Sequence, residues 1–160
     1  MRKLYKQLET GELAYHEAWV SGSQVLEHWG IVGTRGERKG HRKWFFRSER
    51  SSIDRVLRGA SADGYQPFEQ ERMPYLLVEY GIGSTGEEES LNKRYRLQEL
   101  LDELLGWTGI GHCDGGSIGS GTMEACCVVV DFDLAKRVVE EALRDTEFSD
   151  YQRIYLESND

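Results

Sequence analysis

Short apolar runs, rich in aromatic and β-branched residues and broken by glycine, fill the first fifty residues, as is typical of β-strands. The runs cover residues 3–8, 14–20, 24–32 and 42–46. Turn-forming residues separate the runs, at Gly11, at 21–23 and throughout 33–40. This pattern predicts an antiparallel meander of strands joined by short turns.

A helical period follows the strand-rich segment. Ser51 and Asp54, three residues apart, form a capping-box pattern. Apolar residues then recur at helical spacing, at Ile53, Val56, Leu57 and Ala60. Gly64 stands where the C-terminal cap of this helix is expected. The polar stretch that ends at Pro74 suits a linker, so the first domain is expected to cover residues 1–70.

Residues 75–160 combine strand-like runs with two helical stripes. The strand-like runs are residues 75–80, 107–113, 123–130 and 151–156. One leucine-rich stripe follows the glutamates at 87–89, and the other follows Asp131 or Asp133, either of which can cap a helix. The order β-α-β-β-α-β is that of a ferredoxin-like sandwich, an antiparallel sheet with both helices on one face. We therefore expect an α+β protein whose second domain, residues 75–160, is ferredoxin-like.

A glycine-rich segment, residues 115–121, joins two of these expected strands. Phosphate-binding glycine motifs lead from a strand into a helix, whereas this segment leads from strand to strand. We interpret it as a flexible hairpin loop that contacts a ligand or a partner. The candidate contact residues in and beside the loop are His112, Asp114, Gly115, Gly116, Ser117, Gly119 and Ser120.

The three cysteines are Cys113, Cys126 and Cys127, an odd number that argues against a disulfide framework. A turn centred near Gly119 would place Cys113 opposite Cys126, and His112 opposite Cys127. Neighbouring strand residues face opposite sides, so small apolar packing is favoured over a catalytic thiol or a zinc site. We expect no metal, no cofactor and no catalysis. A metal- or thiol-dependent enzyme that uses His112, Cys113 and Cys126 is left as an alternative.

Composition and charge add two constraints. Hydrophobic residues make up 39% and charged residues 30% of the chain, as in globular proteins. No apolar run suits a membrane span, and the first residues lack a secretory signal, so we expect a cytoplasmic protein. Residues 1–73 hold 13 Lys/Arg and 10 Asp/Glu, whereas residues 74–160 hold 7 and 18. Opposite charge in the two halves suggests separate partners, or that one half masks the other.

The sequence Trp29-Gly30-Ile31-Val32-Gly33-Thr34, followed by a basic turn and a short helix, resembles the WGR domain over about residues 2–70. Trp29, Gly30 and Gly33 match the family's motif, Trp-Gly-Arg followed by a Val-Gly or Ile-Gly step. The domain is known from DNA-dependent poly(ADP-ribose) polymerases, where it helps hold a DNA end, and from small bacterial proteins. Ile31 stands in place of the motif arginine, whose guanidinium can contact phosphate. Residues 75–160 resemble uncharacterised bacterial ferredoxin-like domains.

Cationic side chains crowd around the turn that follows this motif. The candidate nucleic-acid contacts are Trp29, Arg35, Arg38, Lys39, Arg42 and Lys43. Cations neutralise phosphates, and exposed aromatic faces stack on bases. The alternative is a solvated hairpin with Trp29 and Trp44 packed in the core.

These observations predict a non-catalytic binding or adaptor protein. Its WGR-like module would contact DNA or a nucleic-acid enzyme, and its acidic ferredoxin-like domain would dock a protein partner. No membrane association is expected, and pairing of sheet edges offers a route to a homodimer. A toxin-neutralising immunity protein is the main alternative, because acidity speeds association with a basic toxin.

Overall fold

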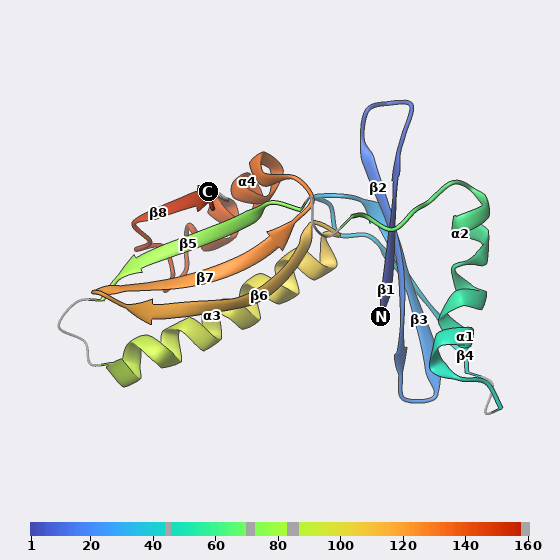
Figure 1. Ribbon diagram of the computed structural model, residues 1–160, viewed down its shortest axis with the longest axis horizontal. Helices are drawn as coiled ribbons and strands as arrows, with labels where there is room; N and C mark the ends of the chain where they lie inside the picture. The colour runs from blue at the N-terminus through green and yellow to red at the C-terminus, as the bar shows by residue number, and fades with distance from the viewer. Residues whose placement is uncertain (44–45, 70–72, 83–86, 158–160) are drawn as a thin grey trace. The chain divides into compact units, whose positions relative to one another are not determined.

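The chain divides into two compact units, Met1–Gln70 and Glu71–Asp160, called here the first and second units. The computed structural model describes residues 1–43, 46–69, 73–82 and 87–157. Each unit has one four-stranded antiparallel sheet and, among the described residues, two helices, so the protein is α+β (Figure 1).

The sheet of the first unit is a meander with strand order β1-β2-β3-β4. Its strands are β1 (Arg2–Gln7), β2 (Leu13–Ser21), β3 (Gln24–Ile31) and β4 (Glu37–Arg42). Gly11 and Gly22 occupy the first two turns with φ of 86° and 56°, a region that glycine enters without steric cost. The first three predicted strands are therefore confirmed to within two residues.

The fourth strand lies earlier in the chain than predicted. β4 begins at Glu37 and ends at Arg42, whereas residues 42–46 were expected to form it. The prediction followed apolar residues, and β4 has none, because it is an edge strand held by its backbone pairing with β3. Arg38 and Lys39 consequently lie in a strand and not in a turn. Trp44, expected in this strand, lies outside the described residues.

Two short helices, α1 (Glu49–Val56) and α2 (Arg58–Ala62), replace the single predicted helix. Ser48 caps α1, since its side chain accepts a hydrogen bond from the Ser51 N–H at 3.2 Å. The predicted cap at Ser51 is wrong by three residues. Gly64 lies directly after the end of α2 with φ of 91°, in agreement with the predicted C-terminal cap.

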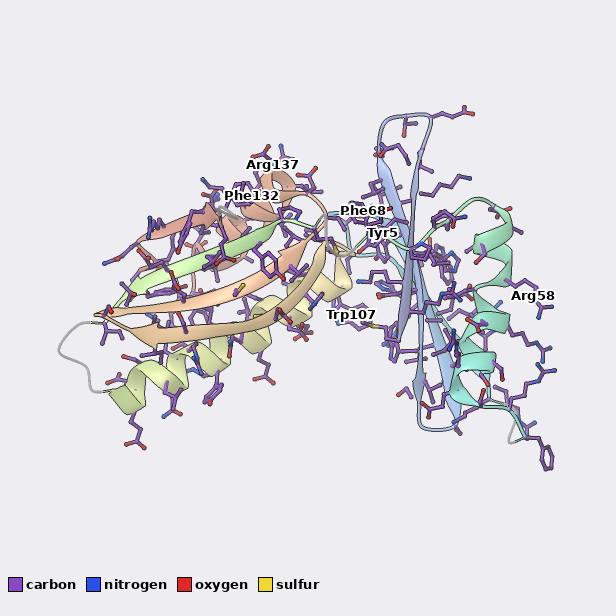
Figure 2. The ribbon with its side chains drawn as sticks, viewed as in Figure 1. Tyr5, Arg58, Phe68, Trp107, Phe132 and Arg137 are labelled. Atoms are coloured by element: carbon purple, nitrogen blue, oxygen red, sulfur yellow. The ribbon has the colours of Figure 1, made fainter. Side chains whose placement is uncertain are left out.

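After α2 the chain returns to β1. The Tyr5 N–H donates to the Gln66 carbonyl at 2.7 Å, and the Gln66 N–H donates back to Tyr5 at 2.8 Å. The Tyr5 ring then meets Phe68 edge to face, with 5.5 Å between ring centroids (Figure 2). These contacts fix the end of the first unit against its first strand.

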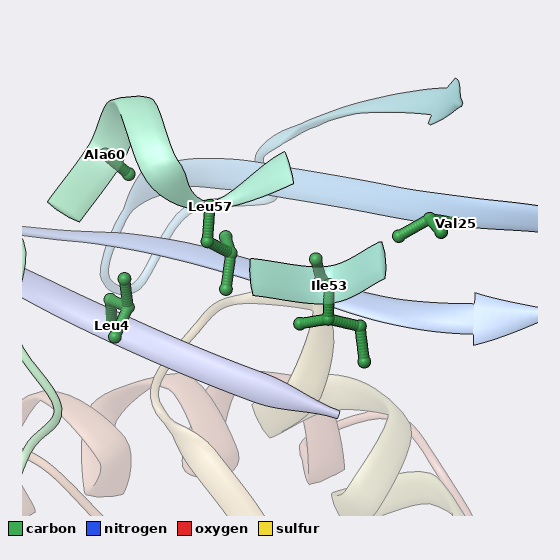
Figure 3. Close-up of a cluster of buried hydrophobic side chains, with 6 residues drawn as sticks. Leu4, Val25, Ile53, Leu57 and Ala60 are labelled. Atoms are coloured by element: carbon green, nitrogen blue, oxygen red, sulfur yellow. The ribbon is translucent and has the colours of Figure 1, made fainter. Parts of the chain in front are cut away.

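One face of the first sheet packs against α1 and α2. Alternate residues of β1, β2 and β3 project toward the helices and are removed from water. The resulting core consists of Leu4, Ala18, Val25, Ile53, Leu57 and Ala60 (Figure 3). Burial of side chains of this kind contributes about 25 cal/mol for each Å² of apolar surface, which ties the helices to the sheet.

The sheet of the second unit has the strand order β6-β7-β5-β8. Its strands are β5 (Tyr75–Gly81), β6 (Gly111–Gly119), β7 (Thr122–Val129) and β8 (Arg153–Leu156). Helix α3 (Glu87–Trp107) joins β5 to β6, and α4 (Phe132–Leu143) joins β7 to β8. The Asp131 side chain caps α4 by accepting from the Leu134 N–H at 2.9 Å, which confirms one of the two predicted caps.

The predicted glycine-rich loop is a strand. β6 continues to Gly119, and a two-residue turn of Ser120 and Gly121, with φ of 53° and 85°, leads into β7. The interpretation of Gly115, Gly116, Ser117 and Gly119 as loop residues is therefore wrong. Glycine is uncommon in strands, and pairing with β7 overrides that preference here. His112 and Asp114 also lie within β6, so of the candidate loop residues only Ser120 is in a turn.

The predicted register of the hairpin is wrong by one residue. Cys113 pairs with Cys127, and His112 pairs with Val128. A β-bulge between Cys113 and Gly115 then brings Gly115 opposite Cys126.

None of the described helices is long and apolar enough to cross a membrane.

Candidate functional site

The predicted nucleic-acid contacts are divided between the two faces of the first sheet. Lys39 lies opposite Glu27 and shares its face with Trp29, whereas Arg38 and Arg42 project from the other face of β4. Trp29 is half-buried, with its ring 5.7 Å from that of His16. Trp29 and the predicted cations therefore do not form one continuous surface.

The two remaining predicted cations flank β4. Arg35 is exposed in the turn that precedes the strand. Lys43 follows the strand and is half-buried, with its Nζ 3.5 Å from Oε1 of Glu49. Four of the five predicted basic side chains are exposed, and Lys43 is the exception.

An open cavity of about 500 Å³ lies between the end of β4 and helix α1. Three exposed arginines line it: Arg42 at the end of β4, Arg47 before α1 and Arg55 on α1. The rest of the lining consists of Val25, Gly40, His41, Ser52 and Val56. Among the described residues that line the cavity, none is acidic.

The local sequence positions these three arginines. Ser48 is the N-cap of α1, so Arg47 lies directly before the N-terminus of the helix. The Ser52 hydroxyl donates to the Ser48 carbonyl at 3.0 Å, and Val56 packs against the apolar core one residue after Arg55. The arginine side chains are thus attached to backbone that the core holds in place.

A pair of histidines shares one carboxylate beside this cavity. Nε2 of His41 lies 2.5 Å from one oxygen of Glu27, and Nε2 of His16 lies 2.6 Å from the other. The glutamate is mostly buried, with 14% of its side chain exposed. The His41 imidazole is therefore held in place on the wall of the cavity.

The arrangement suits an oxyanion. A guanidinium presents a planar fork of N–H donors that matches the oxygens of phosphate, and its charge is fixed at all physiological pH. Phe46, adjacent to Arg47, is 100% exposed and offers an aromatic face beside the cations. The predicted contacts did not include Arg47, Arg55 or His41, because the strand and helix that bring them to the cavity could not be placed from local patterns.

A second polar cluster lies inside the first sheet and was not predicted. Nδ1 of His28 lies 2.8 Å from Glu17 Oε1, and the Tyr15 hydroxyl lies 3.0 Å from Nε2 of the same ring. The Lys3 ammonium approaches the other Glu17 oxygen at 3.1 Å. Burial raises the pKa of Tyr15 to about 12. Tyr15 and Glu17 are alternate residues of one strand, a spacing that could have indicated a shared face.

This buried cluster does not offer a reaction site. His28 and Tyr15 are both 0% exposed, so no substrate reaches either side chain. The groups hydrogen-bond one another, as buried polar side chains in stable folds do. Their role is to hold β1, β2 and β3 together.

The residues of the thiol-enzyme hypothesis are not brought together in the second unit. His112 and Cys113 are neighbours on β6 and face opposite sides of the sheet. Burial raises the pKa of Cys126 to about 11, which disfavours its thiolate. Within the part of the chain that the structure describes, no group of three or more His, Cys, Asp or Glu side chains could hold a metal ion.

Other polar side chains on this sheet form hydrogen bonds with one another. Ser117 donates to Glu124 at 2.9 Å, and the Tyr155 hydroxyl donates to the same carboxylate at 2.5 Å. The Arg153 guanidinium binds both oxygens of Glu79, at 2.9 and 2.7 Å, and this holds the pKa of Glu79 below its ordinary value. Ser117, predicted as a partner contact, therefore has an intramolecular role.

No protein-family model, curated protein or solved structure matches this chain.

Proposed function

We propose that the chain is a non-catalytic binding protein whose first unit contacts the phosphates of nucleic acid. The observation that carries this proposal is the cavity beside α1, which the exposed residues Arg42, Arg47 and Arg55 line. Phosphate groups are the anions that such a cluster accommodates best, because each guanidinium can bind two oxygens at once.

The charge of the site favours contact with the phosphate backbone of nucleic acid over recognition of its base sequence. Phosphate contacts position a protein on nucleic acid, whereas base edges specify sequence. Three arginines around one open cavity supply the positive charge that phosphate contacts require. Phe46 can add a stacking contact to an unpaired base. Binding is therefore expected to depend strongly on salt and weakly on sequence.

The close packing of the Trp29-Gly30 step supports a WGR-like assignment of the first unit. A Cβ atom added at Gly30 would lie 2.9 Å from the Gly36 Cα and 3.2 Å from the Tyr15 ring, so only glycine fits there. The family's motif arginine is Ile31 in this chain. In this proposal the arginines of the cavity supply the positive charge that Ile31 lacks.

The strand order of the second sheet, with helices in both crossover connections, supports a ferredoxin-like assignment of the second unit. We propose that this acidic unit docks a protein partner. On the β6 edge, Asp102 accepts from the Cys113 N–H at 3.0 Å and Arg94 donates to the Gly116 carbonyl at 3.0 Å. These helix α3 side chains occupy part of that edge, so a homodimer formed by strand pairing would use β8.

Fluorescence anisotropy with labelled nicked and blunt DNA duplexes at low salt tests the nucleic-acid proposal. We expect saturable binding that weakens steeply as salt is added. For substitutions of the cavity arginines by Gln, the matched control is Arg58→Gln. Arg58 is exposed on α2 but does not line the cavity (Figure 2). No anisotropy change for either duplex at low salt would remove nucleic acid from the proposal.

A further inference from the structure

Cys113 and Cys127 face each other across the β6–β7 pair. The Cys113 N–H points away from β7, because it donates to Asp102 Oδ1 on α3 at 3.0 Å. On the same pair, the Val130 N–H donates to the Ile110 carbonyl at 2.9 Å. Hydrogen-bonded and non-hydrogen-bonded residue pairs alternate along two antiparallel strands. Counted from the Ile110–Val130 pair, Cys113 and Cys127 form a non-hydrogen-bonded pair, the kind whose Cα atoms lie closer together.

This backbone geometry suits a disulfide. Residues of a non-hydrogen-bonded pair have Cα atoms about 4.5 Å apart, and disulfides span Cα distances of roughly 4.4–6.8 Å. Both side chains project to the same side of the sheet, because they are register partners. Closure of a bond between them therefore requires little backbone movement.

The two thiols differ in access and in acidity. Cys127 is 0% exposed, whereas Cys113 is half-buried at the bulge of the edge strand. The hydrogen bond from the Cys127 thiol lowers the pKa of Cys113, and the same bond together with burial raises the pKa of Cys127. Cys113 is thus the thiol that an oxidant reaches first, and Cys127 is poised to act second.

We infer that Cys113 and Cys127 are an oxidation site at which a small disulfide, such as oxidised glutathione, produces an intramolecular disulfide. The Cys113 thiolate attacks one sulfur of the oxidant, and one glutathione thiolate leaves. The Cys127 thiol then gives its proton to the released glutathione thiolate, and its sulfur attacks Cys113 Sγ and displaces the second glutathione. Two protein thiols are oxidised, and one glutathione disulfide is reduced to two glutathione thiols.

Cys126 does not compete for this bond. It lies opposite Gly115 beyond the bulge, and its side chain faces the other side of the sheet from Cys127. Its backbone carbonyl accepts from the Cys113 thiol at 3.3 Å, but its own thiol is directed elsewhere. The site therefore selects one pair from the three cysteines.

The test is oxidation of the full chain with oxidised glutathione at about pH 8, followed by alkylation and peptide mapping by mass spectrometry. We expect free thiols to fall from three to one, with Cys126 alkylated and Cys113 linked to Cys127. Cys126→Ser should form the same bond, and Cys113→Ser should lose it. A bond that involves Cys126, a stable glutathione adduct on Cys113, or three free thiols after oxidation would each overturn the inference. The mapping on the natural chain decides the outcome even if Cys113→Ser does not fold.

Discussion

The Glu17 carboxylate and the His28 imidazole meet inside the first sheet, with 2.8 Å between Oε1 and Nδ1. Glu17 is 4% and His28 0% exposed. Lys3 and Tyr15 engage the remaining polar atoms of the pair, at 3.1 and 3.0 Å. Because the cluster is closed, removal of one member leaves buried polar groups without partners, which costs more than the hydrogen bond itself contributes.

Glu17→Ala is expected to lower the free energy of unfolding by about 3 kcal/mol, since it leaves Lys3 and His28 without their carboxylate. Urea denaturation followed by circular dichroism measures this change. Glu9→Ala, at an exposed position, is the control and should stay within about 0.5 kcal/mol of the natural chain. Equal stability of the two variants would contradict a structural role for the cluster.

Alkaline pH is expected to destabilise the first unit through Tyr15. Burial raises the pKa of its hydroxyl from 10.0 to about 12, so the folded state favours the neutral phenol. The associated stability is fully present below pH 10 and is lost as the pH rises toward 12. Urea denaturation at a series of pH values measures the loss. Tyr15→Phe should make the profile less steep above pH 10, while Tyr5, whose pKa burial also raises, keeps its own contribution. A profile that is identical in the two proteins would exclude Tyr15 as its source.

Gly36→Ala is expected to destabilise the protein by about 2–3 kcal/mol through overpacking. A Cβ atom at this position would collide with the Trp29 carbonyl and the Tyr15 hydroxyl. Gly59→Ala is the matched change, because a Cβ atom there meets nothing within 4 Å and alanine favours the helix by about 0.5–1 kcal/mol. Thermal unfolding should therefore move in opposite directions for the two variants. A melting temperature of Gly36→Ala at or above that of the natural chain would count against the packing described.

The sequence predicts those elements of this fold that have a strong apolar period. β2 and α4 carry alternating or helical stripes, and both lie within two residues of their predicted positions. β4 has no apolar residue, and only its pairing with β3 makes it a strand, so local pattern could not place it. The glycine-rich end of β6 was not predicted as a strand for the same reason, since only its pairing with β7 makes it one.

The candidate site was only partly predictable. Arg42 and Arg47 stand out in the sequence as members of a basic segment, but the helix start at Ser48 decides which arginines line the cavity. Arg55 joins them from α1 only after the helix packs on the sheet. The Cys113–Cys127 pair was missed because the turn lies at Ser120 and Gly121 and not near Gly119, and because a bulge near Asp114 then shifts the register again. A bulge has no reliable signal in a single sequence.

The central claim is that the cavity arginines bind phosphate, and the salt dependence of duplex binding tests it most directly. The slope of log Kd against log salt should fall by about 3 when Arg42, Arg47 and Arg55 are all changed to Gln, since each phosphate contact contributes about 1. Arg58→Gln should leave the slope unchanged. If the triple variant binds the nicked duplex with the affinity and the slope of the natural chain, the cavity is not the nucleic-acid site.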